Sequence, residues 1–228
     1  ADTLHSVATQ TYKGIEHIII DGLSRDNTIE IVRQFPHVQK VFSEKDKGIF
    51  DGMNKGVSRA TGEVVGILNS DDLYNNTQVI EWVMERFADP SVDVVYGDLL
   101  YVDAKDLNKV VRYWKAGNYS ASSFYRGWMP PHPTFFVRRR FYEQFGDFHL
   151  KLRSAADYEL MLRFLLRHRL RPSYIPKVLV RMRMGGNSNA SFKGRLKANA
   201  EDREAWAMNS LKPHPWTLWL KPLRKLPQ

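Results

Sequence analysis

Residues 63–72 read Glu63-Val64-Val65-Gly66-Ile67-Leu68-Asn69-Ser70-Asp71-Asp72 and join an apolar run to two adjacent carboxylates. The apolar run predicts a buried strand that ends in a turn. Carboxylates beside a buried strand are costly unless a cation neutralises them, so Asp71 and Asp72 predict a site for a divalent metal. A phosphate-bearing ligand would bring the negative charge that such a metal bridges. We therefore interpret this turn as a clamp for a metal ion and a diphosphate.

Strands and helices alternate on both sides of this turn. Strands are expected at Ile15–Asp21, Val38–Ser43, Glu63–Leu68 and Val92–Tyr96, and helices at Thr3–Thr9, Asn27–Phe35, Asp51–Ala60 and Thr77–Phe87. This alternation favours an α/β fold in which helices flank a mostly parallel sheet. Ligands of such sheets bind beyond the carboxyl ends of the strands, so Asp21 and Asp71 are expected to face one crevice.

The composition changes after Gly97 to sequence rich in Tyr, Trp and Pro, with a helix expected at Ala156–Arg167 and a strand at Ser173–Val180. No linker or internal repeat separates the two parts. We therefore expect residues 1–103 and 104–190 to be two halves of one domain. Residues 191–228 are expected to form a basic, aromatic tail.

The composition excludes several classes of site. The chain has 228 residues, 43% of them apolar, and no cysteine, which excludes disulfides and thiolate zinc sites. It has no apolar run long enough to span a bilayer and no signal peptide, so we expect a soluble or peripheral, cytoplasmic protein. The net charge of +9 is concentrated in the second half. Without a zinc finger or an RNA-binding signature, we expect no nucleic acid partner.

Two further loops carry candidate ligand-binding groups. Asp21 and Ser24 follow the first strand, where a carboxylate can accept hydrogen bonds from a nucleobase or a ribose. The alternative is a local turn in which Asp21 and Ser24 only cap the backbone. The loop from Glu44 to Gly56 is rich in glycine and charge and contains Asp46, Asn54 and Lys55; it is either a phosphate loop or an exposed cap.

These motifs, taken in order, resemble family 2 glycosyltransferases of the GT-A fold that build bacterial surface polysaccharides. The resemblance covers about residues 1–190 and is carried by Ile20-Asp21-Gly22-x-Ser24-x-Asp26-x-Thr28, Asp46-Lys47-Gly48-Ile49-x-Asp51-x-Met53-Asn54-Lys55-Gly56, Ala60-Thr61-Gly62-Glu63-x-x-Gly66-x-Leu68-Asn69-Ser70-Asp71-Asp72, Pro131-His132-Pro133, Ala156-Asp157-Tyr158-Glu159-Leu160-x-x-Arg163 and Gly185-Gly186-x-Ser188.

The resemblance implies a function for each part. Residues 1–103 would bind a nucleotide-diphosphate sugar through Asp21, Ser24, Asp46, Asn54, Lys55 and Asp71. Asp72, with Asp71, would hold manganese or magnesium, and Asp157 would be the catalytic base. Such an enzyme inverts the anomeric centre as it moves one hexosyl or N-acetylhexosaminyl unit to a hydroxyl of a glycan or a lipid-linked acceptor.

Three residues on the acceptor side keep an alternative interpretation. Asp157 could instead be a first-turn carboxylate that interacts with the helix dipole. His132, between two prolines, could line the diphosphate or acceptor pocket or be a structural histidine. Arg163 could contact a phosphate or pair with a carboxylate on its own helix.

The sequence departs from the family in three places. The usual opening strand is expected to be missing, because Ala1–Leu4 already has the pattern of a helix. Leu23 and Asn27 stand where small residues are usual. The Gln-x-x-Arg-Trp signature of processive synthases is absent, which favours addition of a single sugar. Two other classes stay open: a nucleotidyltransferase that forms the sugar nucleotide, and a binding module without activity.

The tail combines Trp216, Leu218, Trp219, Leu220 and Leu223 with Lys221, Arg224 and Lys225. It is too short to span a bilayer but suits the surface of an anionic membrane. The alternative is a helix that folds back on the core, although Pro213, Pro215 and Pro222 interrupt a regular helix.

Overall fold

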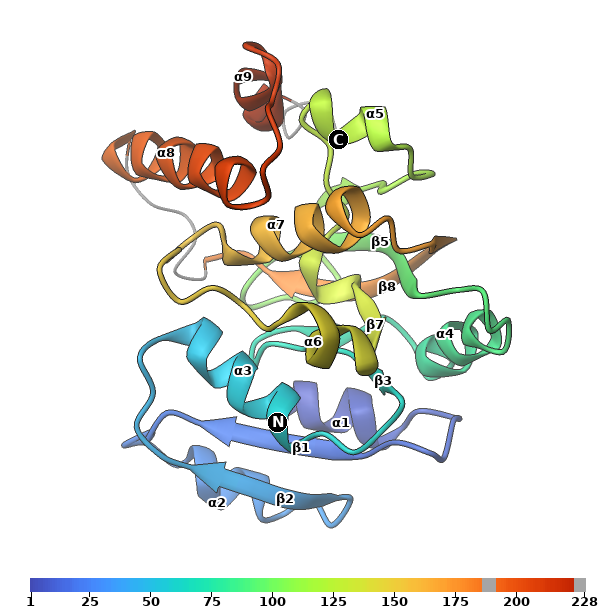
Figure 1. Ribbon diagram of the computed structural model, residues 1–228. Helices are drawn as coiled ribbons and strands as arrows, with labels where there is room; N and C mark the ends of the chain where they lie inside the picture. Colours follow the sequence, from blue (N-terminus) through green and yellow to red (C-terminus); the bar gives the residue numbers. More distant parts are fainter. Residues whose placement is uncertain (186–191, 224–228) are drawn as a thin grey trace.

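The computed structural model describes residues 1–185 and 192–223, which fold as an α/β protein (Figure 1). The α-helices are α1 (Asp2–Ala8), α2 (Thr28–Val32), α3 (Ile49–Arg59), α4 (Val79–Phe87), α5 (Ala121–Tyr125), α6 (Arg140–Phe145), α7 (Ala156–Met161), α8 (Phe192–Met208) and α9 (Thr217–Leu223). The strands are β1 (His17–Asp21), β2 (Val38–Ser43), β3 (Val64–Val65), β4 (Leu73–Tyr74), β5 (Val94–Val102), β6 (Val110–Trp114), β7 (Phe136–Arg138) and β8 (Pro172–Arg183). A 3₁₀ turn, η1 (His132–Thr134), precedes β7, and a π-helical segment, η2 (Leu162–Arg167), continues α7.

The strands form two sheets. β1 and β2 pair in parallel, and the others form a six-stranded sheet in the order β3-β7-β5-β8-β4, with β6 paired to β5. In this larger sheet β5 and β8 are parallel, whereas the pairs β3–β7, β5–β7, β4–β8 and β5–β6 are antiparallel. The expected α/β fold is confirmed, but the expected mostly parallel sheet is confirmed only in part. A short return such as the one between β5 and β6 permits only antiparallel pairing.

The predicted strand Glu63–Leu68 is much shorter in the structure than in the sequence pattern. Only β3 (Val64–Val65) is strand, and it pairs with β7 on one edge. No ladder joins β3 to β1 within the described residues, so the apolar run lacks a second neighbour. By contrast, β2 (Val38–Ser43) has the predicted bounds, and α1 is the first described element, as expected.

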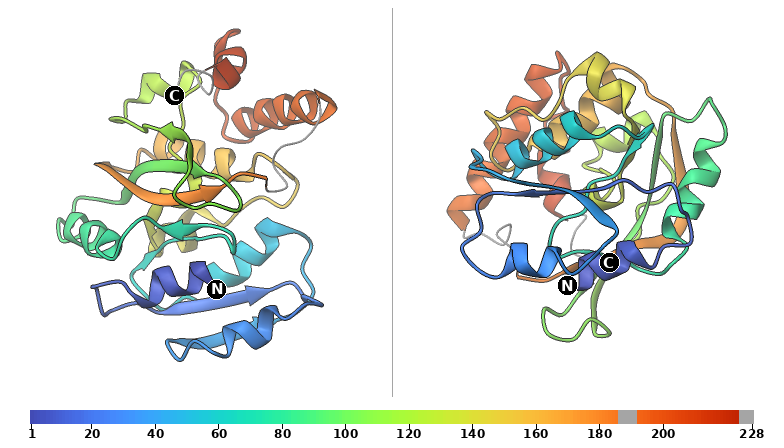
Figure 2. Two further views of the ribbon diagram at one scale, coloured as in Figure 1. Left: turned by 180° about the vertical axis from the view of Figure 1, so that it is seen from behind. Right: turned by 90° about the horizontal axis from the view of Figure 1, so that it is seen from below.

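The larger sheet is packed between helices on both faces (Figure 2). Alternate residues of β5 point to opposite faces: Tyr96 lies in a cluster with Leu160 and Trp206, and Leu99 lies in a second cluster with Val83 of α4. The first cluster also contains Val57 of α3 and Leu218 of α9. Residues from all three predicted parts of the chain therefore share one core.

The predicted helix Ala156–Arg167 is present, but its second half is widened. α7 is α-helical to Met161, and η2 has π-helical hydrogen bonding from Leu162 to Arg167. Such widening is often found at functional sites, and here it continues the helix whose first turn carries Asp157.

The tail includes a helix that packs on the core. In α9, Thr217 and Leu218 are buried, and the Thr217 Oγ1 donates a hydrogen bond to the backbone oxygen of Tyr125 at 2.6 Å. Trp216 and Trp219 are exposed. Arg224 and Lys225 of the predicted membrane contact, and Gly186 and Ser188 of the last family motif, lie outside the described residues. None of the described helices has the length and apolar character needed to cross a bilayer.

Candidate active site

The turn after β3 buries one of its two carboxylates. Asp72 has no exposed surface, whereas Asp71 is half-buried. The Asn69 Nδ2 donates to Asp72 Oδ2 at 2.9 Å, and the Thr3 Oγ1 of α1 donates to the backbone oxygen of Ser70 at 2.7 Å. Asp72 Oδ1 is buried without a hydrogen-bond partner among the described residues. A buried carboxylate oxygen without a donor is rare in folded proteins and marks a position where a cation would fit.

The electrostatics of Asp72 agree with that assignment. Burial raises the pKa of Asp72 to about 7, and the negative charge of Asp71 acts in the same direction. Asn69 and Arg183 oppose this shift. Among the described residues no three His, Asp or Glu side chains are grouped as a metal cage. The protein therefore offers two carboxylates, which is the set that magnesium or manganese uses when a substrate phosphate supplies other ligands.

Asp21 closes the turn after β1. It is 6% exposed, its carboxylate accepts the backbone N–H of Ser24 at 3.1 Å, and it accepts the Ser43 Oγ–H at 2.5 Å. Burial would raise the pKa of Asp21, but these hydrogen bonds outweigh it and the pKa is lowered. Leu23 lies between them with φ of 65°, a left-handed conformation that costs energy for a side chain with a Cβ. Asp21 is therefore an ionised, preorganised acceptor.

The loop before α3 lies against this turn. The Asp46 carboxylate packs over the bare Cα of Gly22, where a Cβ would overlap it. Asp46 Oδ1 accepts the backbone N–H of Gly48 at 2.9 Å. Lys55 Nζ donates to the backbone oxygen of Lys45 at 2.7 Å, which holds the loop to α3. The first two predicted loops therefore meet, with Asp21, Asp46 and Lys55 close to one edge.

Asn54 has a different position from the one predicted. Its Nδ2 donates to the backbone oxygen of Phe148 at 2.9 Å, and its Oδ1 accepts the backbone N–H of Phe148 at 2.9 Å. Both ends of the amide are thus used in attaching the chain before α7 to α3. We therefore assign Asn54 to this link and do not retain it among the nucleotide-binding residues.

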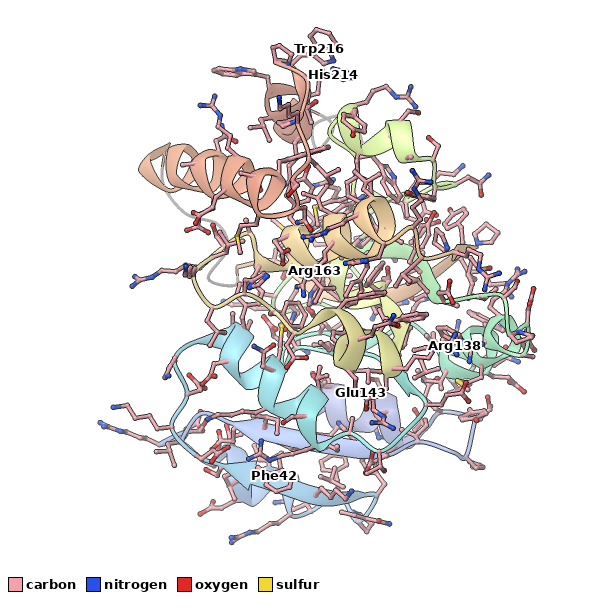
Figure 3. All side chains as sticks on the ribbon, viewed as in Figure 1. Phe42, Arg138, Glu143, Arg163, His214 and Trp216 are labelled. Carbon is pink, nitrogen blue, oxygen red and sulfur yellow. The ribbon has the colours of Figure 1, made fainter. Side chains whose placement is uncertain are left out.

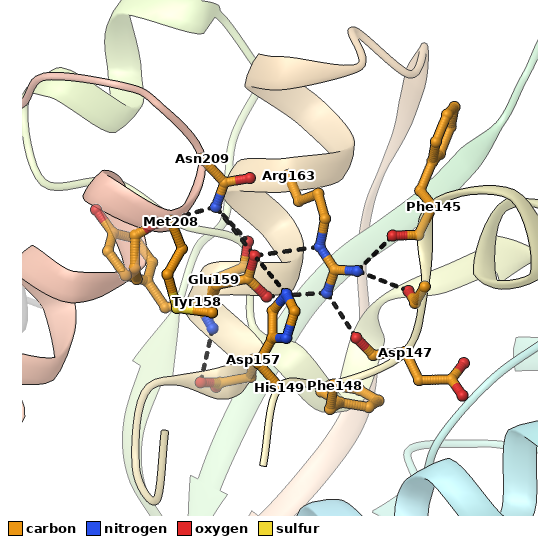
Figure 4. Close-up of polar contacts among 12 residues, drawn as sticks. Phe145, Asp147, Phe148, His149, Asp157, Tyr158, Glu159, Arg163, Met208 and Asn209 are labelled. Atoms are coloured by element: carbon orange, nitrogen blue, oxygen red, sulfur yellow. Dashed lines mark hydrogen bonds and ion pairs between the residues drawn. The ribbon is translucent and has the colours of Figure 1, made fainter. Parts of the chain in front are cut away.

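Arg163 is also fully used inside the protein (Figure 4). Its guanidinium donates to Glu159 at 3.1 and 2.9 Å and to the backbone oxygens of Phe145, Gly146 and Asp147 at 2.6, 2.8 and 2.6 Å. Arg163 is 5% exposed and Glu159 is 1% exposed. The interpretation of Arg163 as a phosphate or acceptor contact is wrong, because no donor is left for a ligand. The alternative, a carboxylate partner on its own helix, is confirmed.

The Asn209 amide completes this buried network from α8. Its Nδ2 donates to Glu159 Oε1 at 3.0 Å and to the backbone oxygen of Ala205 at 2.9 Å. The network joins α7, the residues after α6 and the chain at the end of α8 (Figure 4). It therefore fixes the start of α7, where Asp157 lies.

Asp157 and His132 lie near each other at the edge of the larger sheet. Asp157 is half-buried, and its Oδ1 accepts the backbone N–H of Tyr158 at 2.7 Å. The His132 ring meets Phe148 edge to face, with centroids 5.6 Å apart. Burial lowers the pKa of His132 more than the charge of Asp157 raises it. His132 is therefore neutral beside a carboxylate at neutral pH.

Tyr101 and Arg183 are site residues that the sequence did not indicate. Burial raises the pKa of Tyr101, and the charges of Asp72 and Asp157 add to this shift while Arg112 opposes it. Both carboxylates therefore act on the Tyr101 hydroxyl. Strand register explains the proximity, since Leu73 pairs with Arg181 and Tyr101 pairs with Met182. Arg183 belongs to a basic run that looked like surface charge, and Tyr101 had no sequence signal.

Comparisons with known proteins agree with the sequence resemblance. The family model described as Glycosyl transferase family 2 matches residues 1–160. A "PGL/p-HBAD biosynthesis glycosyltransferase" of Mycobacterium tuberculosis is 29% identical over 193 residues, which are 82% of this chain and 72% of the relative. The putative teichuronic acid biosynthesis glycosyltransferase TuaG of Bacillus subtilis is 35% identical over 92 residues, 37% of this chain and 36% of the relative.

Two solved structures share the fold. The mannosyltransferase PcManGT of Pyrobaculum calidifontis, solved with GDP-Man and Mn2+, has a TM-score of 0.65 and 19% identity over 98% of this chain and 64% of that one. TarS 1-349 of S. aureus, in complex with UDP-GlcNAc, has a TM-score of 0.62 and 18% identity over 87% of this chain and 61% of that one. The chain thus spans less than two thirds of these two structures.

Proposed function

Because the chain belongs to glycosyl transferase family 2, we propose that it moves a single hexosyl or N-acetylhexosaminyl unit from a nucleotide-diphosphate sugar to a hydroxyl of a glycan or lipid-linked acceptor. The named relatives are glycosyltransferases of PGL/p-HBAD biosynthesis and, putatively, of teichuronic acid biosynthesis, and two fold neighbours were solved with UDP-GlcNAc or GDP-Man. These names support the proposed classes of donor and acceptor.

One observation supports the proposal above all: Asp72 Oδ1 is buried and has no hydrogen-bond partner within residues 1–185 and 192–223. Asp72 and Asp71 fit manganese or magnesium, and the diphosphate of the donor would provide further oxygen ligands. Bound there, the metal would act as a Lewis acid that stabilises the charge of the departing diphosphate. Asp72 would be the main ligand, because its carboxylate is buried and no water can take the place of the metal as its partner.

The nucleotide end of the donor would lie against the turn after β1. Asp21 is ionised and fixed by Ser24 and Ser43, so it is ready to accept hydrogen bonds from a base or a ribose. Asp46 lies on the neighbouring loop, and Lys55 of α3, whose Nζ donates to the backbone of that loop, would provide positive charge near the phosphates. This order, base then phosphate then metal, follows the order of these segments along the chain from β1 to β3.

The acceptor hydroxyl would lose its proton to Asp157. A carboxylate at the first turn of α7 is half-exposed, so it can reach a substrate, and its helix is fixed by the buried Glu159–Arg163 pair. His132 would accept or donate one hydrogen bond at the same place as a neutral imidazole. Direct attack by the hydroxyl on the anomeric carbon would invert its configuration.

We further propose that the enzyme works in the cytoplasm, on the inner face of the cell membrane. A lipid-linked acceptor would be presented there, and the tail would provide the contact with the anionic surface. The exposed Trp216 and Trp219 support this proposal, since tryptophan favours the membrane interface.

The proposal is tested by measuring donor binding and transfer. Thermal shift against the common sugar-nucleotide classes, with and without manganese, should reveal one class that stabilises the fold only with metal. Transfer to a lipid-linked or glycan acceptor should then require the same sugar nucleotide and the same metal. No stabilisation by any sugar nucleotide in the presence of manganese or magnesium would refute the proposed function.

A further inference from the structure

A cavity lies far from the candidate active site. It has a volume of about 600 Å³ and is lined mainly by apolar surface, including Tyr119, Tyr125, Leu170 and Leu211. Its wall also includes Pro172, which is the first residue of β8. The last residue of β8 is Arg183, which lies near Asp72. A twelve-residue strand spans roughly 35 Å. The cavity is therefore at the opposite end of the sheet from the proposed donor site, and large enough for a small amphiphile.

The mouth of this cavity is positively charged. Arg169 is exposed there, and Arg171 has a 62% exposed side chain whose Nε alone bonds Asp93, at 3.2 Å. Lys212, next to the lining residue Leu211, is also exposed. None of the described lining residues carries a carboxylate. An occupant with an apolar body and an anionic head would match both the walls and the mouth.

Exposed tryptophans lie beside the cavity. Tyr125, a lining residue, contacts His214 with ring centroids 5.1 Å apart, and His214 stacks on Trp216 at 5.0 Å. Trp216 is 55% exposed and Trp219 is 66% exposed, and Figure 3 places Trp216 at the extreme end of the molecule. A chain of ring contacts through Tyr125 and His214 therefore links the cavity to Trp216.

Helix α9 presents this surface rigidly. The Lys221 Nζ donates to Asp202 at 2.6 Å and lies 3.5 Å from the centroid of the Tyr158 ring. The backbone at Leu220 and Lys221 approaches Gly127 so closely that a Cβ there would overlap it. The tryptophans are thus fixed outward by a helix docked on the core, and their exposure is built into the fold.

We propose that the cavity, Arg169, Arg171, Trp216 and Trp219 form a docking face for an anionic lipid bilayer, in which one lipid places its chain in the cavity and its headgroup at the arginines. This proposal names the site of the membrane contact suggested above, and lipid binding there does not require sugar transfer. The net charge of +9 favours an anionic surface, as does a lining in which no described residue carries a carboxylate.

Vesicle flotation tests the face as a whole. The full chain should bind vesicles of phosphatidylcholine that contain one quarter phosphatidylglycerol, and binding should weaken as salt rises. Arg169→Gln should weaken it about fivefold, the effect of one cation near such a surface. Trp216→Ser with Trp219→Ser should weaken it about tenfold or more. The matched control is Arg33→Gln, directly after α2 at the other end of the molecule (Figure 1), which should bind like the unmodified chain.

A second experiment tests the cavity itself. A short-chain phosphatidylglycerol, kept below its micelle concentration, should raise the melting temperature, and glycerol phosphate should not. Ala121→Trp would fill the mouth from the exposed start of α5 and should abolish that shift, whereas Ala104→Trp in a distant exposed turn should not. Normal lipid binding by Ala121→Trp and Arg169→Gln would overturn the proposal, as would equal stabilisation by glycerol phosphate.

Donor binding separates this proposal from the proposed function. The lipid-face variants should keep the metal-dependent thermal shift with sugar nucleotide, because their side chains lie at the far end of β8. A chain that binds lipid at this face but no sugar nucleotide would refute the proposed function alone. A chain that binds sugar nucleotide but no anionic vesicle would refute the docking face alone.

Discussion

Replacing Asp72 by Asn should have opposite effects on donor binding and on the stability of the metal-free protein. The amide keeps the shape of the side chain and can still accept the hydrogen bond from Asn69, now 2.9 Å long. It removes the buried charge, however. If that charge is the main metal ligand, its loss costs about 3–5 kcal/mol, as in other buried charge pairs. Metal-dependent nucleotide binding should then weaken by about two to four orders of magnitude.

Without metal, the same charge is a burden on the fold. The pKa of Asp72 is raised from 3.8 to about 7, so the folded protein binds more protons than the unfolded chain between these values. The free energy of unfolding therefore falls as the pH rises through that window, by up to about 4 kcal/mol. At about pH 8 in a chelator, Asp72→Asn should thus be more stable than the unmodified protein, up to this amount.

Isothermal titration with manganese and nucleotide measures the first effect, and urea unfolding with a chelator measures the second. Asp106→Asn, in an exposed turn, is the matched control and should change neither quantity. Unchanged metal-dependent binding in Asp72→Asn would refute the metal assignment. A large loss of stability in the chelator would refute the view that the charge is uncompensated.

Three other substitutions test the rest of the site and the fold. Asp157→Asn should keep donor binding but lower the transfer rate about 10²- to 10⁴-fold, as expected for loss of a general base; full activity with the true acceptor would exclude that role. Arg163→Met should lower the free energy of unfolding by about 3–5 kcal/mol, because Glu159 would remain buried without its arginine. Adding Glu159→Leu should restore part of that free energy. An Arg163→Met variant as stable as the unmodified protein would contradict the stabilising role of the buried pair. Burial and the charge of His37 lower the pKa of His17 from 6.5 to about 4. Between pH 6.5 and pH 4 the unfolded chain therefore binds more protons than the folded protein. The free energy of unfolding should fall by up to about 3 kcal/mol as the pH falls through this range. His17→Leu should flatten that dependence in urea titrations, and an unchanged slope would exclude His17 as its source.

Local sequence patterns predicted where most elements lie, but not how the strands pair. Val38–Ser43 has the predicted bounds because its alternation and its flanking residues are local features. Glu63–Leu68 is equally apolar, yet only Val64–Val65 is strand, because a strand exists only where a neighbour supplies hydrogen bonds. The antiparallel pairs of the larger sheet likewise depend on connections that periodicity does not describe.

The role of Arg163 shows the same division. Its position four residues after Glu159 predicted a pair on one helix face. The backbone oxygens of Phe145, Gly146 and Asp147 take the remaining donors of the guanidinium, so none is left for a phosphate. The sequence pattern does not show these three contacts. The tail follows this rule too: its aromatic and basic composition is local, whereas the docking of α9 depends on Tyr125 and Asp202 from other elements.

Local residue patterns are enough to predict that two carboxylates follow an apolar run, that Asp21 ends a strand, and that a further carboxylate opens a late helix. The packing of distant elements, by contrast, buries Asp72 with one oxygen that has no hydrogen-bond partner in the described part of the chain, and brings Tyr101 to where both Asp72 and Asp157 act on it. The physical reason is that desolvation and electrostatic interaction depend on distance in space. The groups that exclude water from a side chain come from elements far apart in the chain, and no local pattern encodes their approach.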